Sequence, residues 1–483
     1  MSNVRVTRRA FLRTATIGSA VGLLAACAPA APAAPKAEAP KAEAPAAAKP
    51  AVEAKPTEAP AGGASLQGKQ GTLWGLKYDP HVDAYKRLSA MFEKKTGAVL
   101  KVEPQDWPIE TKVITALSAG TSPDAVCIMG KVLPPLHLQK ALLPCMDLVY
   151  KPVGIDPYKD FFPDAAGAYT WGSEIYGVPV EVNGVGSMVN VPVDDVTEAK
   201  LNDKFPPTNG KMFFESYEDM YELAKSLQKK EGDKVSRWGL SSQGWDSTSL
   251  LGIIRSLGTD WWDVNNKKFN ANSEAGVKAL EYLVEKPVKM GIETQLDQTG
   301  IDAAMQGKVS IVRGNGTPTV QGKALGYHYE LTGAPKVNGK DPLFIGEAGW
   351  GFAAPKATKN QDISVAFLQM MATPEGQMEY SKIYDGIISS SRSLAGKFDW
   401  FKDSSPDNQN VKAAKVMLGA LLPNTIYYGD QFGYASEIDK ACGEVCAQVR
   451  QGKATAAEGA KLLQERFENQ YKQYTDDLKK LGG

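Results

Sequence analysis

The sequence predicts an α/β fold in which mostly parallel sheets are flanked by helices. From about residue 66 onward, short apolar segments alternate with amphipathic segments of helical period. Residues 125–129 form a continuous apolar run, which is typical of a strand buried on both faces of a parallel sheet. The order strand, helix, strand, helix, strand over residues 72–129 favours a parallel sheet with helices on its faces.

The first elements follow from residue spacing. Residues 72–74 and 99–102 predict short strands. Between them we predict a helix over 82–95 that ends at Gly97, because apolar residues recur at helical spacing, at Val82, Tyr85, Leu88 and Phe92. A second helix stops before Gly120 and is marked by Val113, Ile114 and Leu117.

Four later helices have a start signal or helical periodicity. Residues 216–219 (SYED) resemble a capping box that opens a helix over 217–230. Apolar residues at helical spacing predict a helix over 274–286. Residues 373–375 (TPE) form a helix start with proline at the first helical position. Residues 455–458 (TAAE) form another capping box, which opens a C-terminal helix.

The composition excludes several classes of protein. The chain has 483 residues with 55 basic and 55 acidic side chains, and this balance argues against a nucleic-acid-binding protein. No apolar run reaches the roughly 18 residues that a membrane-spanning helix needs. Five cysteines in 483 residues rule out a scaffold built on disulfides.

Residues 1–26 predict a removable export signal. Four arginines without an acidic residue precede an uncharged apolar segment over 14–26. Residues 7–13 (TRRAFLR) resemble the twin-arginine (Tat) export signal S/T-R-R-x-F-L-K, with arginine replacing the final lysine. Residues 24–27 (LAAC) resemble the lipobox of bacterial lipoproteins, in which the cysteine, here Cys27, is lipidated and anchors the mature chain to the membrane.

A tether follows the lipobox. Residues 28–64 contain 17 Ala and 8 Pro, and Val52 is their only large apolar side chain. A proline about every five residues interrupts the helix that Ala, Lys and Glu favour. We therefore expect a semi-rigid, extended segment that holds a folded domain away from the membrane.

The sequence contains no common catalytic or metal-binding motif. Its three histidines lie outside any zinc pattern, and neither a nucleophile elbow nor a Walker A loop occurs. Residues 349–354 (GWGFAA) fit the glycine pattern of dinucleotide sites. That pattern needs a helix to open within it, whereas Pro355 follows here and the segment predicts a strand. We therefore expect no cofactor and no metal.

Four cysteines lie outside the lipobox. Cys127 and Cys145 flank one predicted helix, and Cys442 and Cys446 are one helical turn apart. All four fit small buried core residues. A Cys127–Cys145 disulfide is an alternative that an exported protein permits.

Seven motifs occur in a fixed order over nearly all of residues 69–483. They are Trp74 and the segments 92–97 (FEKKTG), 119–124 (AGTSPD), 175–183 (IYGVPVEVN), 303–309 (AAMQGKV), 349–356 (GWGFAAPK) and 373–377 (TPEGQ). Together they resemble the extracellular solute-binding proteins of family 1, the sugar-capturing subunits of ABC importers. Their counterparts there are FEK-x-TG, AAG-x-x-PD, IYG-x-P, a GKAAM region, GG-x-x-x-x-IPK and TSPEGQ.

The resemblance implies a two-lobed periplasmic-binding-protein-like fold of type II, with α/β lobes joined by crossing hinge strands. Crossings are expected near 179–186, 345–351 and 386–391. The chain would divide into a signal (1–26), a lipidated Cys27 with its tether (27–65), a first lobe (66–183 and 347–388) and a second lobe (184–346 and 389–483). Closure on a ligand would be a population shift driven by contacts to both lobes.

The function implied is capture of a carbohydrate, such as an oligosaccharide, between the lobes and delivery to a membrane permease. The protein would be exported and lipid-anchored at the outer face of the cytoplasmic membrane, in the periplasm or at the cell surface. We expect a monomer without enzymatic turnover, whose partners are the solute, the ABC permease and the membrane, and no nucleic acid.

Candidate ligand-binding residues follow from strand ends and from sugar chemistry. Sugars present apolar faces and rows of hydroxyls, which suit aromatic platforms beside polar side chains. Ligands of such sheets sit beyond the carboxyl ends of the strands. The candidates are Trp74, Tyr78, Asp79, Lys131, Asn183, Trp245, Asp246, Trp262, Asn315, Trp350, Arg392 and Tyr428.

Some of these assignments leave alternatives open. Each aromatic fits a core position as well as a binding position, and Trp261 and Trp262 are not expected to face inward together from one strand. Glu181 shares a face with Asn183, and the resemblance favours Asn183. Residues 313–316 (RGNG) stand where the family commonly has an aromatic residue, so the solute itself is open.

Other functions are the alternatives. The same fold could bind a glycerol phosphoester, a polyamine or ferric iron, and the adjacent tyrosines at 427–428 resemble the tyrosine pairs of ferric-binding proteins. A surface glycan hydrolase would require two carboxyls about 5–9 Å apart across a cleft. A structural adhesin is disfavoured by the α/β pattern.

Overall fold

A computed structural model describes residues 65–106, 109–182, 188–206, 214–345, 349–383, 388–394, 397, 425–426 and 432–480. These residues belong to one compact unit, residues 59–483. The predicted signal, Cys27 and the tether lie outside the described residues, as do Asn183 and Tyr428.

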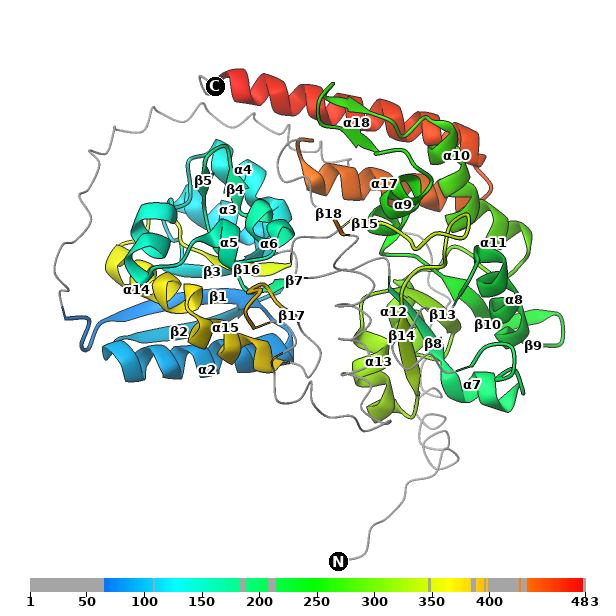
Figure 1. Ribbon diagram of the computed structural model, residues 1–483, viewed down its shortest axis with the longest axis horizontal. Coiled ribbons are helices and arrows are strands. Elements are labelled where there is room, and N and C mark those ends of the chain that lie inside the picture. Colours follow the sequence, from blue (N-terminus) through cyan, green and yellow to red (C-terminus); the bar gives the residue numbers. More distant parts are fainter. Residues whose placement is uncertain are drawn as a thin grey trace, which may run out of the picture. The chain divides into compact units, whose positions relative to one another are not determined.

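The first lobe is built on a five-stranded sheet of order β2-β1-β3-β16-β6 (Figure 1). Strands β1, β2 and β3 are parallel, as the sequence predicts. Strand β16 runs antiparallel to β3 and β6. The strands are β1 (Gln70–Leu76), β2 (Val99–Gln105), β3 (Ala125–Met129), β6 (Val178–Pro179) and β16 (Trp350–Ala353).

Helices on this sheet bury the apolar faces that the spacing predicts. The first ends at Gly97, whose φ of 74° and N–H bond to the Glu93 carbonyl are those of a glycine cap. The predicted start at Thr373 is confirmed, because its hydroxyl accepts the Gly376 N–H. The helices are α2 (Asp79–Thr96), α3 (Ile109–Ala119), α4 (Leu133–Leu138), α5 (Pro157–Asp160), α6 (Pro163–Ala168), α14 (Gln361–Ala372) and α15 (Pro374–Tyr380).

The second lobe is built on a sheet of order β14-β8-β13-β10-β9. Strands β10 and β13 are parallel, whereas β8 is antiparallel to both β13 and β14, and β9 is antiparallel to β10. The strands are β8 (Met188–Pro192), β9 (Lys229–Glu231), β10 (Lys234–Ser241), β13 (Val309–Gly314) and β14 (Tyr329–Thr332).

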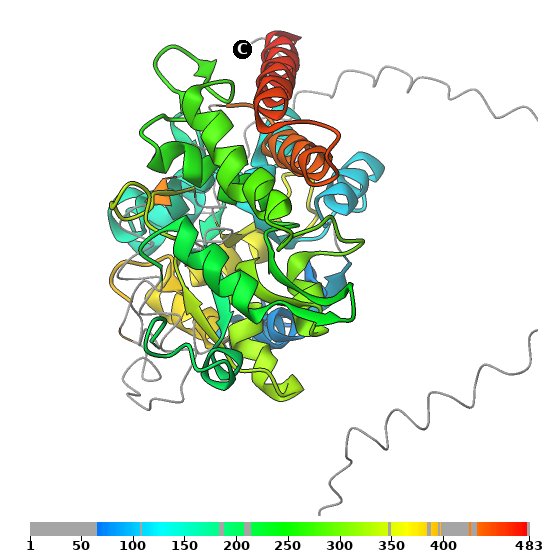
Figure 2. The ribbon, with the colours of Figure 1, turned by 90° about the vertical axis from the view of Figure 1, so that its right-hand side faces the viewer.

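Of the two predicted capping boxes of the second lobe, the one at Thr455 is confirmed in full, whereas Ser216 forms the N-cap alone, because Asp219 Oδ2 accepts the Ser216 hydroxyl and not its N–H. Ser216 accepts the Asp219 N–H, and Thr455 and Glu458 bond reciprocally. The helices are α7 (Val193–Glu198), α8 (Tyr217–Leu227), α9 (Asp246–Ser256), α10 (Glu274–Leu280), α11 (Lys286–Lys289), α12 (Gly300–Met305), α13 (Thr317–Gln321), α17 (Ala435–Arg450) and α18 (Ala456–Lys480). Figure 2 shows α17 and α18, in orange and red, side by side.

The helix predicted over 274–286 is interrupted. It is α-helical as far as Leu280, passes through a π-helical turn (Glu281–Glu285), and resumes as α11. Pro287 explains the break, because it has no N–H for the bond to the carbonyl four residues earlier.

Short strand pairs complete the structure and lie close to the expected crossings. Strand β7 (Glu181–Val182) pairs with β17 (Ile388–Ser389), and β15 (Phe344–Ile345) pairs with β18 (Thr425–Ile426). The remaining pairs are β4 (Thr170–Trp171) with β5 (Glu174–Ile175), and β11 (Trp262–Asp263) with β12 (Lys268–Phe269).

The structure differs from the expectations in two respects. The sheets are mixed rather than mostly parallel, because β8, β14 and β16, which lie next to the crossings, run antiparallel to their neighbours. The third crossing lies later than residues 386–391. Ser391 and Arg392 still bond to the first-lobe residues Phe161 and Asp160, and the chain rejoins the second lobe at β18.

Each lobe has its own hydrophobic core. The first core contains Leu73, Phe92, Ile128 and Phe352, and the second contains Trp261, Trp262, Val445 and Phe467. Of the described residues, Cys127, Cys145, Cys442 and Cys446 carry free, buried thiols, so the core interpretation holds and the disulfide alternative does not. Within the described ranges, no helix combines the length and apolar character needed to cross a membrane.

Candidate functional site

Three predicted residues lie at one edge of the first sheet. Tyr78 follows the carboxyl end of β1, and Lys131 follows the carboxyl end of β3. Strand β16 begins at Trp350, which stands opposite Met129, the last residue of β3. The parallel course of β1 and β3 therefore places all three at the edge where ligands of α/β sheets bind.

A buried histidine, His81, links two of these residues. Its ring makes edge-on contacts with Tyr78 at 5.5 Å and with Trp350 at 5.2 Å between centroids. Burial lowers the pKa of His81 to about 4, so the ring is neutral near pH 7. His81 was not among the residues predicted from the sequence, although its place one turn after Tyr78 and four residues before Tyr85 puts it on the inner face of α2.

Two side chains of this edge reach the second lobe. The Tyr78 hydroxyl accepts a hydrogen bond from Nε2 of Gln321, at the end of α13. Lys131 Nζ lies 3.0 Å from Oδ2 of Asp439 in α17, and both side chains are more than half buried. Gln321 and Asp439 had no distinguishing signal in the sequence, because each is one polar residue among many on its helix.

The second sheet presents a matching edge. Strands β10 and β13 are parallel and end at Ser241 and Gly314, and Trp245 and Asn315 lie just beyond these ends. The Trp245 ring lies directly against Gly314, because a β-carbon added there would come within 2.7 Å of the indole Cδ1. A glycine is therefore required opposite the indole.

Asn315 is held by its own loop. Its Oδ1 accepts the Thr317 N–H at 3.0 Å, and its carbonyl accepts Nδ2 of Asn190 at 2.9 Å. Asn190 is fully buried on β8, and its own Oδ1 accepts the Thr319 hydroxyl at 2.9 Å. These bonds fix the turn after β13 and the start of α13, which carries Gln321.

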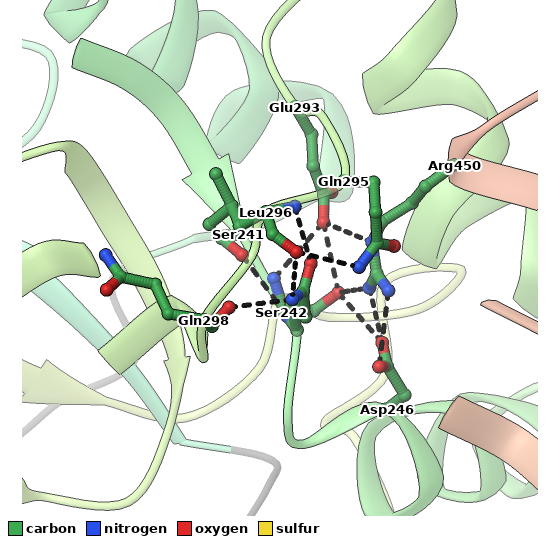
Figure 3. A network of polar contacts seen from close by, with 9 residues as sticks. Ser241, Ser242, Asp246, Glu293, Gln295, Leu296, Gln298 and Arg450 are labelled. Carbon is green, nitrogen blue, oxygen red and sulfur yellow. Dashed lines mark hydrogen bonds and ion pairs between the residues drawn. The ribbon is translucent and has the colours of Figure 1, made fainter. Parts of the chain in front are cut away.

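Asp246, the residue after Trp245 in the sequence, is part of a buried ionic network that Figure 3 shows. Its two carboxylate oxygens face the guanidinium of Arg450, which also donates to Glu293 at 2.9 Å and to the Ser242 hydroxyl at 2.7 Å. Burial raises the pKa of Glu293, and Arg450 offsets part of this rise. The Asp246 carboxylate is therefore engaged by Arg450 and does not face a ligand.

Arg450 was missed, although a sequence signal exists. It follows Cys442 and Cys446 at intervals of four residues, so it lies on the buried face of α17. A charged residue on an apolar helix face predicts a buried ion pair.

Four predicted residues lie elsewhere. Trp74 donates from Nε1 to Glu103 Oε2 at 3.0 Å within the β1–β2 pair, and Asp79 is exposed at the start of α2. Arg392 donates from Nε to the Phe161 carbonyl at 2.8 Å. Trp262 is 1% exposed in the second core.

Trp261 is also 1% exposed, so the expectation that the two tryptophans could not both face inward is wrong. Strand β11 begins only at Trp262, and the alternation of a regular strand does not extend to Trp261. Both rings contact Phe269, with centroids 6.0 and 4.6 Å away.

Glu181, the neighbour of Asn183 along the crossing, is buried beside Trp350. Burial raises the pKa of its carboxyl to about 8, while the Trp350 N–H bond lowers it. A β-carbon on Gly349 would lie 2.1 Å from the Glu181 carbonyl oxygen, so the two crossing segments touch at this point. Asn183 itself is outside the described residues, as are Tyr427 and Tyr428.

An aromatic group joins the lobes at another place. His137 stacks on Trp171 with centroids 4.2 Å apart, and Trp171 lies 5.9 Å from Tyr474 of α18. These rings were not among the predicted site residues, because nothing in their local sequence separates them from core aromatics.

The chemistry of the two edges is that of binding. The part of the chain that the structure describes contains no group of three or more His, Cys, Asp or Glu residues placed to hold a metal ion. Burial raises the pKa of the Cys127 and Cys145 thiols far above neutrality, which keeps them protonated and unreactive. The edges instead supply indole rings, a phenol, amides and one ammonium group, which can recognise a polar molecule with apolar faces.

Comparison with known proteins identifies the family. The model of the family described as bacterial extracellular solute-binding protein matches residues 87–410. The chain belongs to this family. The match spans more than half of the sequence and includes strands of both sheets.

Solved structures of other solute-binding proteins share the two-lobed fold. The GacH receptor of Streptomyces glaucescens, described without ligand and with acarbose, has a TM-score of 0.68 and 18% identity, covering 84% of this chain and 99% of that one. Lmo0181 from Listeria monocytogenes, in complex with cycloalternan, has a TM-score of 0.67 and 16% identity, covering 83% and 98%. A solute-binding protein of Thermotoga lettingae bound with alpha-D-tagatose has a TM-score of 0.67 and 16% identity, covering 84% and 100%. No match was found among curated proteins.

Proposed function

We propose that this protein captures a carbohydrate between the carboxyl edges of its two sheets and delivers it to an ABC permease. The observation that carries the proposal is that Tyr78, Lys131 and Trp350 gather at one edge, and Trp245 and Asn315 at the other. The bonds from Tyr78 to Gln321 and from Lys131 to Asp439 join the first edge to helices α13 and α17 of the second lobe. The similar structures are complexes with acarbose, cycloalternan and tagatose, which supports a carbohydrate.

The proposed binding residues are a subset of the predicted set. Trp245 and Trp350 would offer ring faces, and Tyr78, Asn315 and Lys131 would bond hydroxyls. Asn183 and Tyr428 remain predictions. Trp262 and Asp246 are left out, because one lies in the core and the carboxylate of the other is occupied by Arg450.

Direct binding tests this proposal. The purified protein would be heated with maltotriose, acarbose, cycloalternan or tagatose, and in parallel with spermidine, glycerophosphocholine or ferric citrate. A ligand that binds only the folded state raises the unfolding temperature. Stabilisation by a non-sugar alone would contradict carbohydrate capture, and product accumulating over time would contradict a non-enzymatic role.

A matched pair of variants tests the location of the site. Trp245 and Trp238 both pack against the same small apolar cluster of the second lobe, but only Trp245 lies beyond the carboxyl end of β10. We expect Trp245→Ala to weaken sugar binding about tenfold, the value of a good aromatic contact. Trp238→Ala should lower stability and leave the affinity unchanged.

We also propose the route to the membrane that the N-terminus predicts. Residues 1–26 would be removed, Cys27 lipidated, and the two-lobed body from residue 66 onward would act as a monomer outside the cytoplasmic membrane. Cys27→Ser should release the protein from the membrane fraction and abolish palmitate labelling. Replacing Arg8 and Arg9 by lysine should block export if the Tat route is used, and normal export of that variant would contradict it.

A further inference from the structure

Arg450, the last residue of α17, is enclosed by three acceptor groups. Its side chain is 0% exposed, and its guanidinium uses all three nitrogens. Nε donates to Glu293 Oε1 at 2.9 Å, Nη1 to Asp246 Oδ2 at 3.2 Å, and Nη2 to the Ser242 hydroxyl at 2.7 Å and to Asp246 Oδ1. Such a planar fork fixes the direction of each bond, which a lysine ammonium cannot do.

Two of the three groups that Arg450 binds, Ser242 and Asp246, belong to the loop that carries Trp245. Ser242 and Asp246 lie three residues before and one residue after the indole, at the two ends of this loop, residues 242–246. The other side of the loop is tied down as well, because Gln243 Nε2 donates to the carbonyls of Leu296 at 2.8 Å and Gln298 at 2.7 Å (Figure 3). Trp245 thus lies in a loop fixed at both ends, and its own backbone N–H donates to the Ser242 carbonyl at 3.1 Å.

A buried ionic group is a poor device for stability alone. Its desolvation is costly, and apolar residues of similar volume often stabilise a core as well or better. Burial raises the pKa of Glu293, and the charge of the nearby Asp246 carboxylate adds to this rise. The network does specify geometry, because its donors and acceptors fit in one arrangement only.

We propose that Arg450 is a positioning residue that holds the 242–246 loop so that the Trp245 ring stands at the carboxyl edge of the second sheet. This role deepens the proposed sugar-binding function and rests on it. Arg450 would thereby affect the affinity for the sugar without contacting the sugar itself.

The first test reads the ring directly and needs no ligand. The purified protein would be labelled with 5-fluorotryptophan, and the ¹⁹F resonance of Trp245 assigned by its loss in Trp245→Phe. We expect Arg450→Met to shift or broaden that resonance. The matched control is Arg237→Met, which removes another buried arginine on β10 whose carboxylate partner, Asp195, is 2.7 Å away at the far end of the sheet. An unchanged Trp245 resonance in Arg450→Met, or an equal change in Arg237→Met, overturns the proposal.

Milder variants keep the test decisive if Arg450→Met fails to fold. Arg450→Lys keeps the charge and loses the fork, and Ser242→Ala removes one acceptor. Each should move the Trp245 resonance in the same direction by a smaller amount. A folded Arg450→Lys protein with the wild-type resonance overturns the proposal equally.

The second test separates positioning from general stability. Binding of maltotriose, acarbose and cycloalternan would be titrated in wild type, Arg450→Met, Trp245→Ala and the double variant. We expect about tenfold weaker binding in each single variant and no further loss in the double, because Arg450 acts through Trp245. A further loss of affinity in the double variant would show that Arg450 does not act through Trp245. Absence of binding in wild type defeats the proposed function instead, and the ¹⁹F result still decides the positioning role.

Discussion

Replacing Gly349 by alanine should destabilise the protein, whereas the same replacement at Gly443 should stabilise it. Gly349 has a φ of 50°, a left-handed conformation that disfavours a side chain. An added β-carbon would lie 2.1 Å from the Glu181 carbonyl oxygen and 3.1 Å from Glu181 Cγ. Gly443, inside α17, has no atom within 4 Å of the same position.

The magnitudes follow from these two environments. A non-glycine residue in the left-handed region costs about 1–2 kcal/mol. Moving a backbone carbonyl aside in a packed region adds about 1–3 kcal/mol. Gly349→Ala should therefore lower the free energy of unfolding by about 2–5 kcal/mol. Gly443→Ala should raise it by about 1 kcal/mol, the difference in helix propensity.

Urea unfolding at 25 °C would measure both changes, with tryptophan fluorescence and far-ultraviolet circular dichroism as separate probes. Coincident transitions would justify a single free energy for the two lobes. Gly349 also lies next to Trp350 at the first edge, so Gly349→Ala should weaken sugar binding, while Gly443→Ala should not. A Gly349→Ala protein with the wild-type urea midpoint would refute the reasoning, because both penalties are then missing.

Three further predictions concern buried charges and the contact between the lobes. Asp124 is 6% exposed and accepts the Thr72 N–H at 2.7 Å, so Asp124→Ala should lower the urea midpoint, at a cost of about 2–3 kcal/mol; an unchanged midpoint would contradict this. The Glu181 carboxyl loses its proton near pH 4.5 in the unfolded chain and near pH 8 in the folded protein. Its contribution to the free energy of unfolding is therefore complete below pH 4.5 and is lost as the pH rises to 8. The loss is at most about 1.4 kcal/mol per pH unit. Glu181→Gln should remove this slope, and parallel urea midpoints for variant and wild type from pH 5 to 8 would count against it. Lys131→Gln and Asp439→Asn should each change the free energy of unfolding by less than about 1 kcal/mol. The two changes should not add up in the double variant, because both remove the same ion pair. Strict additivity would argue that the ion pair does not form.

The sequence predicted the elements whose signals are local. Strand β3, the glycine stop after α2 and the caps at Ser216, Thr373 and Thr455 depend on residues within one turn or one strand, and all are confirmed. The second lobe's antiparallel strands were not predicted, because strand direction depends on partners far along the chain.

The candidate site was predicted only in part, because some of its contacts also join residues that are far apart in the sequence. Tyr78 and Lys131 follow predicted strands and could be placed from the strand order alone. Trp262 and Asp246 were predicted as binding residues as well, but one ring packs on Tyr471 and one carboxylate meets Arg450, and neither partner is near in sequence. An aromatic or acidic residue has the same local signature in a core and in a binding site.

The order of strands in the first sheet has a consequence for biosynthesis. Strand β3 is an edge until β16 is added, and β16 follows every strand of the second sheet along the chain. A nascent chain that has emerged as far as β14 therefore displays an open, wholly apolar strand, which invites association with other chains. Helices α17 and α18, which cover the second core, emerge last. Neither lobe can complete its core before synthesis is nearly finished. This topology therefore favours folding after release from the ribosome, or a chaperone that shields the unfinished chain.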